Sequence, residues 1–303
     1  MRHFVFFLAF LIFSLSVGCD KFTGDFRFTP DADGLQYSKS TVDFDNTYNN
    51  IVSTLENNPN IGIVAQVDHT ANAASVDFDL RKTRLVLFGN PNLGTPLMQA
   101  NQLAGIDLPQ KMMVFEKHGK TFITYNSVTY LSNRHSLGGV ATLDRIAMAL
   151  NNIASNASGA PVEENASEVQ SGEGIVTIES ANDFQTTYDK LRSSIEKNEN
   201  LRLVIELDHQ ANAARVGLEL RPTRLLVFGN PNLGTPLMQE SETMAIDLPQ
   251  KMLVWENAES QVFVTYNDPE YVAERHGITN QNDILTTIAG ALNNLATNAA
   301  SSE

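Results

Sequence analysis

The sequence predicts an α+β chain of two similar two-layer modules, each a largely antiparallel sheet packed with helices. An internal repeat of domain size is the first observation behind this prediction, and the alternation of helical and strand-like periodicities inside each repeat is the second. The chain also has 303 residues with 42% hydrophobic side chains, which is enough to bury a sizeable core, and its length favours two domains.

The repeat has an offset of 140 residues. Asp68-His69 recurs as Asp208-His209, and 33 of the 49 positions in 68–116 are identical to their counterparts. The run FGNPNLGTPLMQ at 88–99 returns unchanged at 228–239. A unit of about 120 residues is too long for a solenoid repeat and suits a folded domain, so the sequence indicates a tandem duplication.

The domain boundaries follow from this repeat. The segment between the copies contains four Glu, no Lys or Arg, and many small polar residues, which predicts a solvated linker. The predicted organisation is a signal peptide at 1–18, a tether at 19–36, a first module at 37–154, an acidic linker at 155–174, a second module at 175–298 and a tail at 299–303.

The periodicities within the first unit predict its elements in chain order. Asp43 is a possible N-cap for an amphipathic helix, and Thr95-Pro96 resembles a helix start with the hydroxyl as the cap. The predicted elements are a helix at 44–55, strands at 61–67 and 85–88, a helix from 95, strands at 111–116 and 121–125, a short helix that ends near Arg134-His135, and a helix at 143–153.

The charge and cysteine counts exclude several classes of function. The chain has 21 Lys and Arg against 35 Asp and Glu, a net charge of -14, so it lacks the positive charge that nucleic-acid binding requires. A single cysteine excludes disulfide frameworks, thiolate zinc sites and CxxC redox chemistry, because each needs at least two sulfurs.

The N-terminus predicts export. The apolar run at 4–17 suits the h-region of a signal peptide, and Leu15-Ser-Val-Gly-Cys19 resembles the lipobox of bacterial lipoproteins, although Ser16 stands where that motif usually has Leu. The resemblance implies cleavage before Cys19, acylation of that residue, and a cell-envelope protein anchored by lipid to a bacterial membrane, on the periplasmic side or the cell surface. The alternatives are a secreted protein with a free thiol and a retained signal anchor.

The repeated motifs resemble a known family. The blocks FGNPNLGTPLMQ and IDLPQKM.V.E, preceded by DH..NAA and L.R.TR, are similar to those of the bacterial and archaeal "domain of unknown function 302" family, and the resemblance covers nearly all of both units. It implies a compact α+β domain, found singly or in tandem, with no established activity.

One candidate ligand site is the glycine-rich turn. It is not a phosphate loop, because Lys is missing before Thr95 and Pro91 removes an N–H group. The turn and the amides of a Thr95-capped helix could still hold a small anion or carboxylate; alternatively the residues supply only turn geometry. The candidate binding residues are Gly89, Asn90, Gly94 and Thr95, their counterparts Gly229, Asn230, Gly234 and Thr235, and the repeated histidines His69 and His209.

A metal-dependent enzyme or metal-binding protein is the alternative from a different class. Two histidines and a carboxylate bind zinc or ferrous iron if they converge. The candidate sets are His69, His135 and Glu116 in one unit and His209, His276 and Glu256 in the other. Asp107 and Glu116 are also a possible acid–base pair, although Asp107-Leu-Pro fits a turn. No nucleophile motif is present, so we expect no ordinary hydrolase, and any cofactor is unknown.

Several identical polar positions indicate a contact surface or a site. Asn90, Asn92, Gln99, Asp107, Gln110 and Lys111 are all retained in the second copy, whereas 100–105 differ at every position. We therefore expect the two modules to pair about a pseudo-twofold axis. The sequence favours a membrane-tethered envelope protein that binds a small polar or anionic ligand; a metal enzyme and a structural or assembly partner are the competing hypotheses.

Overall fold

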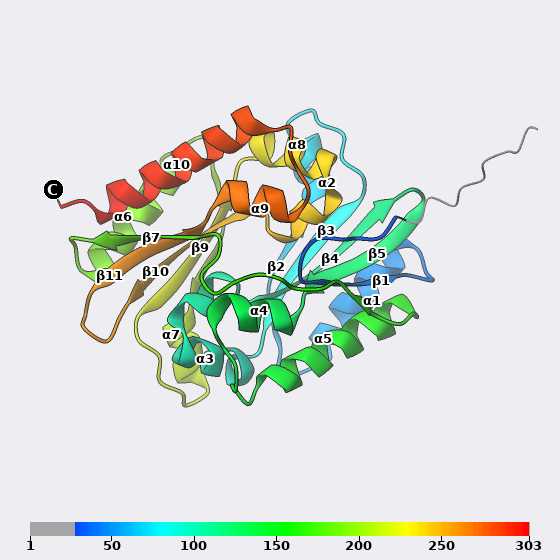
Figure 1. Ribbon diagram of the computed structural model, residues 1–303, viewed down its shortest axis with the longest axis horizontal. Helices are drawn as coiled ribbons and strands as arrows, with labels where there is room; N and C mark the ends of the chain where they lie inside the picture. Colours follow the sequence, from blue (N-terminus) through cyan, green and yellow to red (C-terminus); the bar gives the residue numbers. More distant parts are fainter. Residues whose placement is uncertain (1–27, 303) are drawn as a thin grey trace, which may run out of the picture.

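The computed structural model describes residues 28–302 and contains two antiparallel sheets, each packed with helices (Figure 1). The predicted α+β fold with two repeated modules is confirmed. The elements of the first module are β1 (Leu35–Lys39), α1 (Phe44–Glu56), β2 (Gly62–Asp68), α2 (His69–Ala74), β3 (Thr83–Gly89), α3 (Pro91–Ala100), the 3₁₀ helix η1 (Gln102–Ile106), β4 (Gln110–Lys117), β5 (Lys120–Asn126), α4 (Val128–His135), α5 (Leu143–Ser158) and the short β6 (Glu163–Glu164).

The second module repeats the elements of the first in the same order, except that β6 has no counterpart among its described residues. They are β7 (Ile175–Ser180), α6 (Phe184–Glu196), β8 (Arg202–Asp208), α7 (His209–Arg215), β9 (Thr223–Gly229), α8 (Pro231–Glu240), η2 (Glu242–Ile246), β10 (Gln250–Glu256), β11 (Val262–Asn267), α9 (Pro269–Arg275) and α10 (Asn282–Ala300). The strand orders are β2-β3-β4-β5-β1-β6 and β8-β9-β10-β11-β7, so the two sheets share one topology.

The two faces of each sheet have different partners. Val86 and Phe88 belong to the core that includes α1 and α5, whereas Leu85 and Leu87, which point the other way, belong to a core shared with the second module. In Figure 1, α1 and α5 lie at one end of the molecule and α6 and α10 at the other, with the sheets between them. The sheets therefore bury one face against their own helices and the other against the neighbouring module.

The predicted helix at 44–55 is confirmed as α1. The Asp43 carboxylate accepts a hydrogen bond of 2.9 Å from the amide of Asn46, as an N-cap does. Phe44, Tyr48, Ile51 and Leu55 form its buried stripe.

The segment between the modules, predicted as a solvated linker, is mostly exposed and also contains the end of a helix and a short strand. Helix α5 continues to Ser158, four residues beyond the predicted module boundary. The chain then pairs with β1 through β6, and the amide of Gly34 donates to the carbonyl of Ala166 at 2.8 Å. The reason is that β1 would otherwise be an open sheet edge, and the connecting backbone satisfies its hydrogen bonds.

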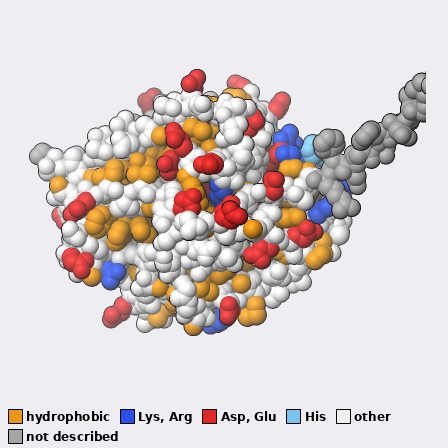
Figure 2. Space-filling model, in the orientation of Figure 1, with side chains coloured by type: hydrophobic (Ala, Val, Ile, Leu, Met, Phe, Trp, Pro, Cys, Tyr) orange, Lys and Arg blue, Asp and Glu red, His pale blue; other side chains and the backbone are white. Residues whose placement is uncertain are grey.

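The predicted signal peptide, the first half of the tether (19–27) and with it Cys19 lie outside the described residues. Within residues 28–302, no helix is both long enough and apolar enough to cross a bilayer. Asp and Glu side chains are spread over the face shown in Figure 2, as the net charge of -14 implies.

Candidate ligand-binding site

The glycine-rich turn forms the start of α3, but not as predicted. The helix begins at Pro91, with the side chain of Asn90 as its N-cap, and Thr95 and Pro96 lie inside it. Thr95 is therefore not the cap. Asn90 is the cap because its side chain accepts a hydrogen bond from the amide of Asn92, and Pro91 fits the first helical position, where its missing N–H is not needed.

The amides at this helix start are already satisfied. The amide of Asn92 donates to Asn90 Oδ1 at 3.0 Å, and the amides of Leu93 and Gly94 donate to the carbonyl of Asn90, each at 2.9 Å. The predicted anion site on free amides is therefore wrong. A Cβ at Gly89 would lie 3.4 Å from the Cβ of Pro109, which is an ordinary van der Waals contact.

The turn residues nevertheless line a pocket, which we call the first pocket. It has a volume of about 570 Å³, within the usual ~300–1,000 Å³ of small-molecule sites. Gly89, Asn90, Gly94 and Thr95 line it together with residues of the second module, among them His209. Its walls are largely apolar, and include Ile63, Phe88, Leu93, Met98, Leu150 and Ile153.

The equivalent turn lines a second pocket of about 120 Å³. Gly229, Asn230, Gly234 and Thr235 are joined there by His69 of the first module. The structure thus brings each predicted turn together with the histidine of the other module. This exchange follows from the packing of α3 beside α7 and of α2 beside α8 (Figure 1).

Arg202 accounts for part of the difference in pocket size. It lines the second pocket and donates to Ser75 Oγ at 3.3 Å, whereas the equivalent position lining the first pocket is Gly62. At this position the second pocket therefore contains a long side chain, whereas the first pocket has a glycine.

Both pocket histidines are neutral near pH 7. Burial lowers the pKa of His69 and of His209 to about 4. His209 Nε2 donates to the carbonyl of Gly105 at 3.3 Å, which leaves Nδ1 unprotonated. Among the described residues, His69 Nε2 and the hydroxyl of Thr235 are buried without a hydrogen-bond partner.

The candidate metal ligands do not converge. His69 lines the second pocket, whereas His135 bonds to Asp107 at 2.8 Å in a different part of the fold. His276 likewise bonds to Asp247, away from His209. No group of three His, Cys, Asp or Glu side chains in residues 28–302 is placed to hold a metal ion, so the convergence that the alternative sets with Glu116 and Glu256 require is not found.

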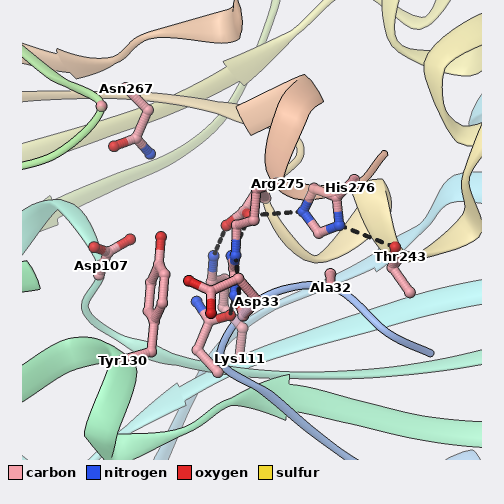
Figure 3. A network of polar contacts seen from close by, with 12 residues as sticks. Ala32, Asp33, Asp107, Lys111, Tyr130, Thr243, Asn267, Arg275 and His276 are labelled. Atoms are coloured by element: carbon pink, nitrogen blue, oxygen red, sulfur yellow. Dashed lines mark hydrogen bonds and ion pairs between the residues drawn. The ribbon is translucent and has the colours of Figure 1, made fainter. Parts of the chain in front are cut away.

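A buried polar network, the inter-module cluster, lies between the sheets. In the first module Arg134 and His135 both contact Asp107, at 2.8 Å each. Arg275 and His276 contact Asp247 in the same way, at 2.6 and 3.0 Å. Figure 3 shows Arg275 and His276 next to each other in this network, with His276 also bonded to Thr243. The cluster comprises Asp107, Lys111, Asn126, Tyr130, Arg134 and His135 with their counterparts Asp247, Lys251, Asn267, Tyr271, Arg275 and His276. Asp107 is therefore partnered by Arg134, His135 and Lys251 and not by Glu116.

Contacts between the modules in this cluster are reciprocal. Lys111 Nζ lies 3.2 Å from Asp247, and Lys251 Nζ lies 3.6 Å from Asp107. Each arginine also crosses to the other module. Arg134 donates to Asn267 Oδ1 at 3.0 Å and Arg275 donates to Asn126 Oδ1 at 2.8 Å. The cluster is therefore a two-fold arrangement made from one chain.

Neighbouring charges and burial together set the pKa values of the residues in the inter-module cluster. Burial alone would raise the pKa of Asp107 and Asp247, but the surrounding Arg and Lys charges and the histidine hydrogen bonds outweigh it and hold both values well below the ordinary range. Burial, reinforced by the Lys111 charge, lowers the pKa of Lys251 to about 7. The charge of Lys251 therefore changes near neutral pH.

The family is shown by a direct comparison. The model of the family described as "Domain of unknown function DUF302" matches residues 36–156 and 176–295, which together are most of the chain. The chain belongs to the DUF302 family. Its resemblance to that family, predicted from the repeated motifs, is confirmed, and both modules are DUF302 modules.

Relatives of this tandem DUF302 chain include proteins with other names. It is 38% identical over 111 residues to the "Fluoride-specific ion channel FluC 1" of Brucella suis and of Brucella abortus, which covers 37% of this chain and 43% and 41% of theirs. The chain thus spans about two fifths of the curated relatives it matches. A crystal structure of an uncharacterized conserved DUF302 protein from Bacillus stearothermophilus aligns at 16% identity with a TM-score of 0.39, over 42% of this chain and 98% of that one.

Sequence reasoning singled out part of the inter-module cluster. Asp107 and Lys111 stood out because they are identical in both DUF302 modules. The repeat also contains Tyr130 and Asn126, which were not chosen as site residues. Repetition in the sequence could have identified them too, because both recur at an offset of 141 residues, as Tyr271 and Asn267.

Proposed function

We propose that the protein is a membrane-tethered binding protein of the cell envelope, and that its first pocket holds a small molecule with an apolar body. The observation that carries the proposal is a pocket of about 570 Å³ whose mostly apolar wall is completed by the other module. An apolar pocket with a few convergent polar groups is the usual form of a small-molecule site.

The polar groups of the first pocket come from both modules. Asn90 and Gln110 belong to the first, and His209 and Asn212 belong to α7 of the second. A ligand there contacts both modules at once, so it would also stabilise their pairing, because any molecule that binds only the folded chain raises its stability.

Binding is tested with the uncharged dye N-phenyl-1-naphthylamine, whose fluorescence rises in an apolar site. Ala149 lines the first pocket, and Ala149→Phe fills it. In the chain from Asp20 to Glu303 we expect saturable binding that weakens at least tenfold in this variant. Ala291→Phe, at the equivalent position in the second pocket, is the matched control and should change the affinity less than twofold.

Absence of saturable binding, or equal loss in both variants, would contradict the binding proposal and favour a structural or assembly role. Thermal unfolding of both variants shows whether they fold. Elemental analysis of the same protein tests the competing metal hypothesis, which requires stoichiometric metal.

The envelope location rests on the apolar run at 4–17 and on Cys19. Similarity to proteins named as ion channels supports a place at a membrane. Mass spectrometry of the mature N-terminus tests it: we expect an acylated Cys19, and a Cys19→Ser chain that no longer partitions into detergent. A mature chain with an unmodified thiol would contradict lipid anchoring.

A further inference from the structure

The arginines of the protein fall into two groups. Most of those in residues 28–302 form ion pairs with carboxylates, namely Arg81, Arg84, Arg134, Arg192, Arg224 and Arg275. Arg145, Arg202, Arg215 and Arg221 have no carboxylate within 4.0 Å among the described residues. Because acidic side chains outnumber basic ones by 35 to 21, an arginine without a carboxylate partner is the unexpected case.

Two of these arginines line the first pocket. Arg145 comes from α5 of the first module and Arg215 from α7 of the second, and both line the pocket. Both side chains are exposed, whereas Ile146 and Leu150 on the same wall are buried. The charged groups therefore lie at the solvent side of the pocket and the apolar groups lie deeper.

Their immediate surroundings leave the guanidinium groups free to bind. Arg215 Nη1 donates to Asn212 Oδ1 at 3.2 Å, and Asn212 lines the same pocket. Arg145 has no hydrogen-bond partner among the described residues. A guanidinium group pairs preferentially with a carboxylate or a similar planar or tetrahedral acid group.

The second module lacks this arrangement. The residues equivalent to Arg145 and Arg215 are Thr287 and Ser75, and neither lines the second pocket. The two arginines are thus a property of the first pocket and not of the DUF302 repeat.

We infer that the first pocket takes an amphipathic acid, with its apolar part among Phe88, Met98 and Leu150 and its acid group at Arg145 and Arg215. This inference rests on the proposed function and adds the chemical class of the ligand. The acid is held between the two modules, because each contributes one arginine.

The test compares decanoate with 1-decanol as competitors of N-phenyl-1-naphthylamine, using the chain from Asp20 to Glu303. These probes share an apolar chain and differ in charge. We expect decanoate to bind at least tenfold more tightly than 1-decanol, and to lose affinity as NaCl is raised, since salt screens an exposed charge pair.

The double variant Arg145→Ala, Arg215→Ala should weaken decanoate binding at least tenfold and change 1-decanol binding less than twofold. The matched control is Arg192→Ala, a partly exposed arginine of α6 that lines neither pocket, which should change neither affinity.

Equal affinity for the two competitors, unchanged by the double variant, would overturn the inference and leave the proposed function standing. Displacement of the dye by neither competitor would overturn it as well. Failure of the dye itself to bind would instead contradict the proposed function.

Discussion

The inter-module cluster and the two pockets have diverged to different degrees since the modules were duplicated. In the cluster Asp107, Lys111 and Arg134 have identical counterparts, and their contacts recur in reciprocal form. The pockets differ in volume, about 570 against 120 Å³, and in the arginines that line them.

Burial explains this difference. A cluster residue contacts both modules, so a change in either copy leaves a buried charge without its partner, which is strongly destabilising. A pocket side chain contacts solvent or ligand, and its replacement leaves no such charge. The paired modules therefore form a fixed scaffold, and the pockets are where the copies can acquire separate specificities.

The largest effect is expected from Asp107→Asn. Arg134 and His135 each contact this carboxylate at 2.8 Å, and Lys251 lies 3.6 Å from it. Removing its charge should lower the free energy of unfolding by about 3–5 kcal/mol, as breaking a buried ion pair does. Urea unfolding followed by circular dichroism measures the change.

Asp247→Asn should lower the free energy of unfolding by a similar amount, because the contacts of Asp247 and Asp107 are reciprocal. Asp144→Asn on the exposed face of α5 is the control and should change stability by less than ~0.5 kcal/mol. A large loss from one cluster aspartate and none from the other would refute the view of the cluster as a two-fold unit.

The next largest expected effect is on the pH dependence of the free energy of unfolding. Lys251 has a pKa of about 7 in the folded chain, against ~10.4 for an unfolded lysine. Between these values the unfolded chain binds a proton that the folded chain does not, so stability contributed by this residue rises with pH, by up to ~1.4 kcal/mol per unit. Below the folded value the penalty is constant.

Lys251→Met removes this titration. We expect the stability of the unaltered chain, relative to the variant, to increase between about pH 7 and 10 in urea unfolding. Lys39→Met, on an exposed lysine, is the matched control for the substitution itself. A flat difference for Lys251→Met would show that its ammonium stays protonated in the cluster.

A smaller effect is expected from exchanging the residues that set pocket size. A Cβ built at Gly62 has no atom within 4 Å, so the arginine of Gly62→Arg has room to extend into the first pocket. We expect this variant to weaken binding of N-phenyl-1-naphthylamine about tenfold. Arg202→Gly should open the second pocket and raise the dye stoichiometry from one to two. Ser75→Ala, which removes only the partner of Arg202, should leave the stoichiometry at one.

Local patterns were enough to predict most of the fold. The helix that begins after Asp43 and the strands around Leu85 and Val114 appear where periodicity placed them, because each buries one side against a neighbouring layer. The start of α3 was misplaced, since Asn90-Pro91 and Thr95-Pro96 both match a cap followed by proline and only one can begin the helix.

The site was less predictable because it depends on the packing between modules. The sequence singled out Asn90 and His209, but their distance in the chain gives no sign that they line one pocket. Arg145 and Arg215 lie outside every repeated motif. Their importance depends on the absence of a carboxylate nearby, which only a three-dimensional arrangement reveals.

The smallest effect tests which residue fixes the start of the equivalent helix, α8. Asn230 caps it, whereas the Thr235 hydroxyl is buried without a partner. Asn230→Ala should therefore lower the free energy of unfolding by about 1 kcal/mol. Thr235→Val keeps the shape and removes an unsatisfied polar atom, so the chain should be equally or more stable in the same urea measurement. A greater loss from Thr235→Val than from Asn230→Ala would mean that the hydroxyl does bond at this turn, and the second pocket would then offer a ligand one polar group fewer.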